Sequence, residues 1–284
     1  MAVLIAGCGD LGTEAGLRFA AAGHRVTGWR RHPQNLPDEI AGVAVDLTGA
    51  LPTIVADTSI VVIATAASER SEAGYRSAYL DVVANVLDAL DRDGIRPERV
   101  LYVSSTAVYG DQGGLVDEAT PASPATATAR VLLETEELLH SRRPDAVVLR
   151  LSGIYGPGRT RLIDQVTSGK ARVPSSSQYT NRIHRDDAAA AIVHLTTAVA
   201  HPLPLYLGTD DEPVELGDVL TFLAAEMGKP EPAADDGPHD ATGRAAATKR
   251  CDNSLLRSTG FEFSYPSYRE GYRAVLAGTG TRHR

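Results

Sequence analysis

The amino-acid sequence predicts an α/β fold in which a doubly wound parallel sheet is joined to a smaller, discontinuous C-terminal domain. Three observations support this prediction. Apolar runs typical of buried strands alternate with helical segments over residues 2–151. A Gly-rich turn directly follows the first apolar run. Beyond residue 152 the alternation becomes irregular, and Gly and Pro accumulate. The first part therefore has the pattern of a Rossmann-type domain.

The composition is that of a folded chain and excludes several classes of protein. Of the 284 residues, 43% are hydrophobic and 23% charged, unlike disordered, collagenous or coiled-coil chains. Lys and Arg number 28 against 36 Asp and Glu, and the net charge of −8 has the wrong sign for a protein that neutralises nucleic-acid phosphates. We expect a small-molecule substrate and no nucleic acid, and the sequence leaves a homodimer open.

The sequence also argues against a membrane or secreted protein. The longest apolar runs, such as residues 59–67, are far shorter than the roughly 20 residues that cross a bilayer. The N-terminus lacks the basic region and cleavage site of a signal peptide, so a cytoplasmic location is expected. Cys8 and Cys251 are too few for a disulfide framework and have no CxxC spacing for zinc. We expect two free thiols and no metal site.

The first βαβ unit is predicted at the N-terminus. A strand at 2–6 leads through the Gly-rich turn into a helix at 13–22, which Gly23 caps before a second strand at 25–29. The remaining elements of the sheet domain follow as strands at 42–47, 59–67, 99–104 and 146–151 and helices at 75–90 and 127–140. Helices are needed between the strands because each parallel strand must return across a face of the sheet.

The second domain is predicted to interrupt the first. Residues 153–159 are expected to be a loop leaving the sheet, a helix at 185–198 and a strand at 203–208 rejoin it, and a helix at 216–227 belongs to the smaller domain. Residues 229–249, rich in Pro, Ala, Gly and Asp, are predicted to be a surface loop or a substrate lid. The dinucleotide-binding domain is assigned to residues 1–152 and about 181–209, the substrate-binding domain to about 153–180 and 210–284.

The Gly-rich turn has the GxGxxG pattern of dinucleotide-binding folds, formed by Gly7, Gly9 and Gly12 with Asp10 and Leu11 between the last two. The first glycine permits the tight turn, the second lets the backbone approach a pyrophosphate, and the third allows close packing of helix on strand. Free N–H groups at the helix start face the anion. The position of the turn between a strand and a helix favours a dinucleotide site over a purely structural turn.

The end of the second strand indicates which cofactor is bound. NAD sites usually place an acid there to hold the ribose hydroxyls, but this strand ends in Arg30 and Arg31. Two guanidinium groups can pair with a 2′-phosphate, so NADP(H) is favoured and NAD(H) is the alternative. The arginines would otherwise form an ordinary solvated turn. Asp46, ending the third strand, is expected to accept from the adenine amino group or to cap the next helix. Other residues expected at the cofactor are Leu47, Ala64 and Ala66.

Several longer segments resemble one known family. They are LYVSSTAVYG at 101–110, LRLSGIYGPGR at 149–159, NRIHRDD at 181–187, KR at 249–250, GFEF at 260–263 and YPSYREG at 265–271. With the Gly-rich turn, they resemble an extended short-chain dehydrogenase/reductase of the NAD-dependent epimerase/dehydratase family over nearly the whole chain. The resemblance implies a nicotinamide cofactor and a catalytic Ser or Thr after the fifth strand. Ser105 holds that position and Thr106 is the neighbouring alternative, although hydroxyls at a strand end are also common caps.

The Tyr-x-x-x-Lys pair of that family is missing. In the family the Tyr is the acid or base, and the Lys lowers its pKa and holds the ribose. This sequence has neither residue type between Tyr109 and His140. Alignment of the helix by its glutamates places Thr126 at the Tyr position and Arg130 at the Lys position. Arg130 could still bind ribose or phosphate but could not easily tune a proton donor. The chain therefore resembles atypical members of the superfamily in which the catalytic pair has changed.

Other side chains are candidates for the missing proton donor. Glu69 follows the fourth strand at the carboxyl edge, where open α/β sheets bind their ligands. Tyr75 and Tyr79 share a helix face nearby, with packing into the core as their alternative role. Further residues expected near the substrate are Tyr155, Arg159 and Arg161, and His184 resembles the structural or substrate-domain histidine of the family.

The sequence thus predicts an NADP(H)-dependent oxidoreductase, or an epimerase- or dehydratase-like enzyme, that acts on a small polar substrate without the usual catalytic pair. Two alternatives stay open. One is a non-catalytic NAD(P)-binding sensor or scaffold, and the other is a non-redox lyase, hydrolase or isomerase on the same fold.

Overall fold

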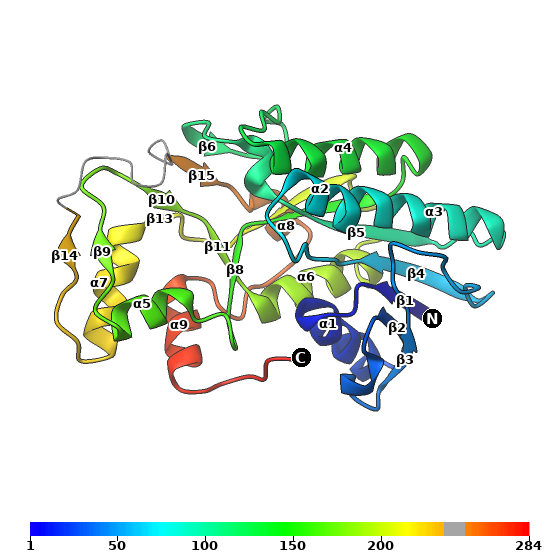
Figure 1. Cartoon of the computed structure of the whole chain (residues 1–284), viewed down its shortest axis with the longest axis horizontal. Coiled ribbons are helices and arrows are strands. Elements are labelled where there is room, and N and C mark those ends of the chain that lie inside the picture. The colour runs from blue at the N-terminus through cyan, green and yellow to red at the C-terminus, as the bar shows by residue number, and fades with distance from the viewer. Residues whose placement is uncertain (236–247, 284) are drawn as a thin grey trace.

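A seven-stranded parallel sheet forms the centre of the molecule (Figure 1). The computed structural model describes residues 1–235 and 248–283. The strands run in the order β3-β2-β1-β4-β5-β7-β12, and all neighbouring pairs are parallel. Their bounds are β1 Ala2–Ala6, β2 Arg25–Arg30, β3 Ile40–Ala44, β4 Thr58–Ile63, β5 Arg99–Ser105, β7 Val147–Leu151 and β12 Leu205–Gly208. The predicted doubly wound α/β fold is confirmed.

Helices cover both faces of this sheet because side chains alternate along each strand. In β1, Val3 and Ile5 face one apolar layer, and Leu4 and Ala6 face the other. Both layers are buried, so the strands are continuous apolar runs. The first layer is covered by α1 (Asp10–Ala21) and α6 (Arg185–Thr197), the second by α3 (Val82–Arg92) and α4 (Ala127–Arg142). No helix in the described residues is long and apolar enough to cross a membrane.

Beyond the sheet, three helices bury a separate core that includes Tyr155, Leu223 and Tyr272. These helices are α5 (Arg161–Thr167), α7 (Leu216–Glu226) and α9 (Tyr268–Leu276). Short strands pair as β10 (Tyr179–Thr180) with β13 (Val214–Glu215), β11 (Arg182–His184) with β8 (Gly153–Tyr155), β14 (Ala233–Ala234) with β9 (Arg172–Val173), and β15 (Lys249–Cys251) with β6 (Gly114–Val116). Further short helical segments are α8 (Ser254–Ser258) and the 3₁₀ turns η1 (Pro33–Asn35) and η3 (Thr106–Tyr109).

Two elements beside the Gly-rich turn have different bounds from those predicted. Helix α1 begins at Asp10, three residues early, because the carbonyl of Gly9 already accepts a helical hydrogen bond of 2.7 Å. Strand β4 ends four residues early, because Ala64 donates the last ladder bond to the carbonyl of Ala6, where β1 also ends. Residues 64–69 therefore leave the sheet next to the Gly-rich turn.

The predicted helix at 75–90 consists of three segments. They are α2 (Glu72–Tyr75), the π-helical turn η2 (Arg76–Asp81) and α3. The hydroxyl of Ser71 caps α2 by accepting from the Gly74 N–H at 3.0 Å. The hydroxyl of Thr65 donates to the carbonyl of Ala78, at 2.6 Å, inside the wider π turn. Such turns occur frequently at functional sites, and this one borders the cleft described below.

The third strand is also shorter than predicted. It ends at Ala44 because its partner β2 ends at Arg30. Asp46 consequently lies beyond the strand, where its carboxylate accepts from the N–H and hydroxyl of Thr48 at 3.0 and 2.8 Å. It stabilises a turn, and the prediction that it caps a helix is wrong.

Two predicted loops contain strands. Residues 153–159 include β8, which pairs with β11 beside the sheet. The described parts of 229–249 include β14 and β15, whereas residues 236–247 of that predicted loop or lid lie outside the described residues. Both cysteines are free thiols, as predicted, and burial raises the pKa of Cys8 and of Cys251 to about 11.

Candidate cofactor and active site

A cleft of about 840 Å³ opens at the carboxyl edge of the sheet. It lies where β1 and β4 are neighbours and the strand order reverses, the usual ligand position in this kind of sheet. The predicted site residues that line it are Gly7, Gly9, Asp10, Leu11, Arg30, Arg31, Asp46, Leu47, Ala64, Ala66, Glu69, Tyr75 and Ser105. Those that do not are Gly12, Thr106, Thr126 and Arg130.

The Gly-rich turn has the geometry that a pyrophosphate requires. Gly7 has a φ of +90°, and a Cβ there would lie 2.8 Å from the carbonyl oxygen of Ala64. A Cβ at Gly9 would have nothing within 4 Å, so the space beside its backbone is open to the cleft. Gly12 lies against the turn itself, with its Cβ position 2.8 Å from the Gly7 carbonyl oxygen. The open backbone at the start of α1 thus fits the phosphates of a dinucleotide.

The end of β2 carries positive charge into the cleft. Arg30 is half-buried, and its Nη1 is buried without a hydrogen-bond partner in the described part of the chain. Arg31 is exposed at the same wall. Asp46 lies on this wall too, but its bonds from Thr48, with a smaller effect of Arg31, lower the pKa of its carboxyl and engage it in a turn. The unpaired nitrogen of Arg30 indicates a place for an anionic group.

Ser105 presents its hydroxyl at the end of β5. Its Oγ accepts from the Ala107 N–H at 3.2 Å, which caps η3 and leaves the O–H free to donate into the cleft. Thr106 is buried and lies outside the cleft lining, and its carbonyl accepts from Lys249 Nζ at 2.7 Å. The structure therefore separates the two hydroxyls, which the sequence could not distinguish.

Helix α4 turns a different face to the cleft from the one predicted. Thr126 is its N-cap, accepting from the Ala129 N–H at 3.1 Å, and Arg130 is exposed. The side chains four residues apart that line the cleft are Thr128 and Leu132. A shift of two residues rotates a side chain by about 200° around a helix, so the predicted alignment of Thr126 and Arg130 with the family pair is wrong. An apolar leucine occupies the cleft position predicted for a cation.

Tyr75 enters the cleft from the segment after β4. It is half-buried, and its ring centroid lies 5.1 Å from that of Tyr79. It packs against a cluster of apolar side chains that includes Leu132. The hydroxyl of Tyr79 accepts from the Ala67 N–H at 3.4 Å, and burial raises its pKa. Glu69 is exposed on the same wall. A phenol, a carboxylate and the hydroxyl of Ser105 therefore line the same cleft.

The other residues predicted near the substrate have separate places. Burial raises the pKa of Tyr155, whose hydroxyl donates to the carbonyl of Ser267 at 3.3 Å. His184 caps α6, and burial lowers its pKa to about 4. Neither lines the cleft. Arg159 does, and it also borders a neighbouring hollow of about 540 Å³ that contains Arg161.

A buried ion pair behind the site was not predicted. Glu136 of α4 accepts from the hydroxyl of Ser104 and from Nε and Nη2 of Arg150, the latter at 2.6 Å. The guanidinium carbon of Arg150 lies 4.7 Å from the ring centroid of Tyr109. These contacts join α4, β5 and β7 directly behind Ser105. In the sequence, only the position of Arg150 within the otherwise apolar strand β7 could have marked this pair.

Comparisons with known proteins agree with this geometry. The family model for the NAD-dependent epimerase/dehydratase family matches residues 3–205. A solved structure from Methylobacillus flagellatus, provisionally named as an NAD-dependent epimerase/dehydratase, is 36% identical, with a TM-score of 0.78 and 97% of each chain covered.

Two curated relatives are similar in sequence. Protein YeeZ of Escherichia coli is 32% identical over 206 residues, covering 69% of this chain and 73% of its own length. A Streptomyces protein named 3-diazoavenalumate denitrifying reductase is 29% identical over 308 aligned positions, covering 95% of this chain and 99% of that protein. With a family match over more than half of its length, this chain belongs to the NAD-dependent epimerase/dehydratase family of extended short-chain dehydrogenases/reductases.

Proposed function

We propose that this chain is an NADP(H)-dependent oxidoreductase that acts on a small polar substrate in the cleft between β1 and β4. The observation that carries the proposal is that one cleft contains both the open Gly-rich turn and two available hydroxyls, those of Ser105 and Tyr75. The likeness to a named reductase over 95% of the chain supports redox chemistry over binding alone.

Preference for NADP(H) is proposed from the end of β2. The buried, unpartnered Nη1 of Arg30 and the exposed guanidinium of Arg31 would hold the 2′-phosphate. Gly9 and the start of α1 would hold the pyrophosphate. The nicotinamide supplies or accepts a hydride when the cofactor is bound.

The chain itself must move a proton on the substrate oxygen when a hydride moves on the attached carbon. Ser105 would orient that oxygen, because its Oγ accepts from the Ala107 N–H and its own O–H remains able to donate into the cleft. Tyr75 would transfer the proton. Its hydroxyl has no hydrogen-bond partner among the described residues, and its ring packs against the cluster containing Leu132, which also lines the cleft. Glu69 is the alternative acid, further out on the same wall.

The substrate is proposed to extend from the cleft toward the smaller domain, residues about 153–180 and 210–284. The neighbouring hollow of about 540 Å³ shares Ile154 and Arg159 with the cleft. It also carries Thr160, Arg161 and Gln165, whose polar groups suit a small polar molecule.

Purified protein can test this function in two steps. Calorimetric titration with NADPH and NADH measures binding, and the nicotinamide absorbance measures turnover with a panel of small carbonyl compounds. Ser105→Ala and Tyr75→Phe should each bind NADPH as the wild type does but turn over slowly. Tyr206→Phe, which removes a phenol on the edge strand β12, is the matched control and should keep the wild-type rate. Failure of the wild type to bind either cofactor would refute the proposal.

A second candidate function is nucleotide sensing without catalysis. It is favoured by Thr128 and Leu132, the cleft-lining side chains four residues apart on α4, because neither is the Tyr or the Lys of the family pair. The double change of Thr128→Tyr and Leu132→Lys separates the two functions. No gain in turnover is expected if Tyr75 already moves the proton, whereas a large gain from a silent wild type would favour the sensor.

A further inference from the structure

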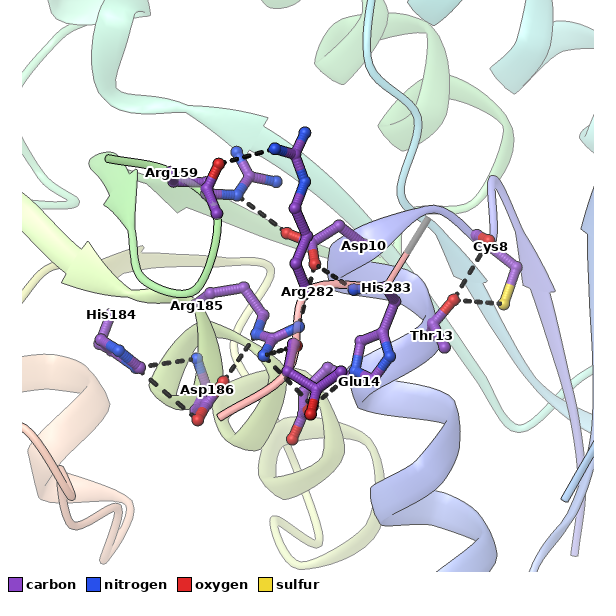
Figure 2. Close-up of polar contacts among 12 residues, drawn as sticks. Cys8, Asp10, Thr13, Glu14, Arg159, His184, Arg185, Asp186, Arg282 and His283 are labelled. Atoms are coloured by element: carbon purple, nitrogen blue, oxygen red, sulfur yellow. Dashed lines mark hydrogen bonds and ion pairs between the residues drawn. The ribbon is translucent and has the colours of Figure 1, made fainter. Parts of the chain in front are cut away.

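Hydrogen-bond donors from three parts of the chain meet at Asp10, the first residue of α1 (Figure 2). Its Oδ2 accepts from Arg159 Nε at 3.0 Å. Its Oδ1 accepts from Arg185 Nη1 at 3.0 Å and from the backbone N–H of His283 at 3.1 Å. A carboxylate beside a phosphate site would repel the ligand, and the two guanidinium groups compensate its charge.

The two arginines differ in how many guanidinium nitrogens remain free to bind a ligand. Arg185 is fully buried, and all three of its guanidinium nitrogens are engaged: Nε with Asp186, Nη1 with Asp10 and Nη2 with the carbonyl of Thr281. Arg159 donates only through Nε, and its Nη1 and Nη2 have no hydrogen-bond partner in the part of the chain that the structure describes. Its side chain is 36% exposed and lines the cleft with Gly9. The guanidinium available to a ligand is therefore that of Arg159.

A segment near the C-terminus holds this arrangement together. We call residues 279–283 the C-terminal strap. Besides its two contacts to Arg185 and Asp10, it places Arg282 against the loop that carries Arg159, with Arg282 Nη1 donating to the carbonyl of Gly158 at 2.7 Å. The ring of His283 also contacts Glu14 of α1 at 3.0 Å. The strap thus ties the Arg159 loop to the start of α1 (Figure 2).

We propose that Arg159 is a ligand of the cofactor pyrophosphate, aimed at the start of α1 by Asp10. This inference rests on the proposed function and adds to it a cation from outside the Gly-rich turn. Backbone N–H groups at the helix start would bind the phosphate oxygens from one side, and the free Nη groups of Arg159 would bind them from the other. Arg185 and the C-terminal strap hold the carboxylate of Asp10 in position through their hydrogen bonds to it.

Calorimetric titration of the full-length chain with three probes tests this inference. NADP⁺ and ADP-ribose contain a pyrophosphate, and adenosine 2′-monophosphate does not. Arg159→Gln should weaken NADP⁺ and ADP-ribose about ten-fold or more, as expected for loss of a charge-assisted contact, and leave adenosine 2′-monophosphate unchanged. Arg159→Lys, which keeps the charge but not the fork, should lose less. Arg172→Gln, a change in an exposed arginine that lines neither the cleft nor the neighbouring hollow, is the matched control for all three probes.

Three results would overturn the inference. If Arg159→Gln binds NADP⁺ and ADP-ribose like the wild type, Arg159 is not a pyrophosphate ligand, even where turnover falls because it contacts the substrate. An equal loss for all three probes would mean that the variant disturbs the whole cleft. If the wild type binds NADP⁺ poorly or not at all, both this inference and the proposed function fail, whereas the first two results leave the proposed function intact.

Discussion

The variant Arg30→Met tests the contribution of Arg30 to cofactor selectivity separately from its contribution to the stability of the fold. Arg30 ends β2 half-buried, and its Nη1 is buried without a partner in the described residues. Methionine keeps much of the aliphatic stem and removes the cation. The unliganded protein therefore loses a donor that was already unpaired.

The two expected effects have different sizes and signs. An unpaired buried donor costs about 1 to 3 kcal/mol, so Arg30→Met should leave the free energy of unfolding unchanged or raise it by about 1 kcal/mol. A charge-assisted bond to the 2′-phosphate contributes about 1.5 to 3 kcal/mol, which corresponds to a loss of about 10- to 150-fold in NADPH affinity. NADH lacks that phosphate, and its affinity should stay the same.

Calorimetric titration with both cofactors, together with urea unfolding, measures these quantities. Arg25→Met is the matched control, because Arg25 starts the same strand and pairs with Asp57 at the opposite, exposed end. If Arg30→Met still prefers NADPH as the wild type does, or if it loses both cofactors equally, the reasoning from the unpaired nitrogen is refuted.

Three further changes test other parts of the structure. Gly9→Val should remain folded by circular dichroism but bind no NADPH, because its Cβ points into the open cleft. Gly12→Val should instead be markedly destabilised, because its Cβ would contact the carbonyl oxygen of Gly7. NADPH binding by folded Gly9→Val would contradict this expectation. Ser105→Ala should lower kcat by about 10² to 10⁴ with NADPH affinity kept, and an unchanged rate would remove Ser105 from the mechanism. Burial raises the pKa of Asp210 from 3.8 to about 8, so the folded state keeps a proton that the unfolded state releases. The contribution of this proton to the free energy of unfolding is complete below pH 3.8 and is lost as the pH rises to about 8. Urea unfolding across this range should therefore show a steeper fall in the free energy of unfolding for the wild type than for Asp210→Asn. Parallel pH dependences of the two proteins would count against a buried neutral carboxyl.

The sheet could be predicted because its strands are buried on both faces. Runs such as residues 60–63 are apolar without interruption, which identifies them without any knowledge of their neighbours. The Gly-rich turn was predictable for a similar reason, since the need for glycine at Gly7 and Gly12 comes from atoms within or beside one βαβ unit.

The face that α4 presents to the cleft could not be predicted from its glutamates. Glu134 is exposed and pairs with Arg76 at 2.7 Å, whereas Glu136 is buried and pairs with Arg150. Two carboxylates two residues apart thus lie on different sides of one helix, and their residue type does not reveal which is buried. The contact of Arg159 with Asp10 was missed because its partners are 149 residues apart and leave no local pattern.

The separations around Asp10 also have a consequence for the order in which the chain is made. The β1-α1-β2 unit precedes the partners of Asp10 in the chain and emerges before them during synthesis, and the pairing of β1 with β2 is local. The groups that surround its carboxylate arrive 149, 175 and 273 residues later, with Arg159, Arg185 and His283. The first turn of α1 can therefore form long before it acquires its full set of contacts. A nascent chain can form the Gly-rich turn early, but the contacts of the Asp10 carboxylate are complete only when translation has passed residue 283.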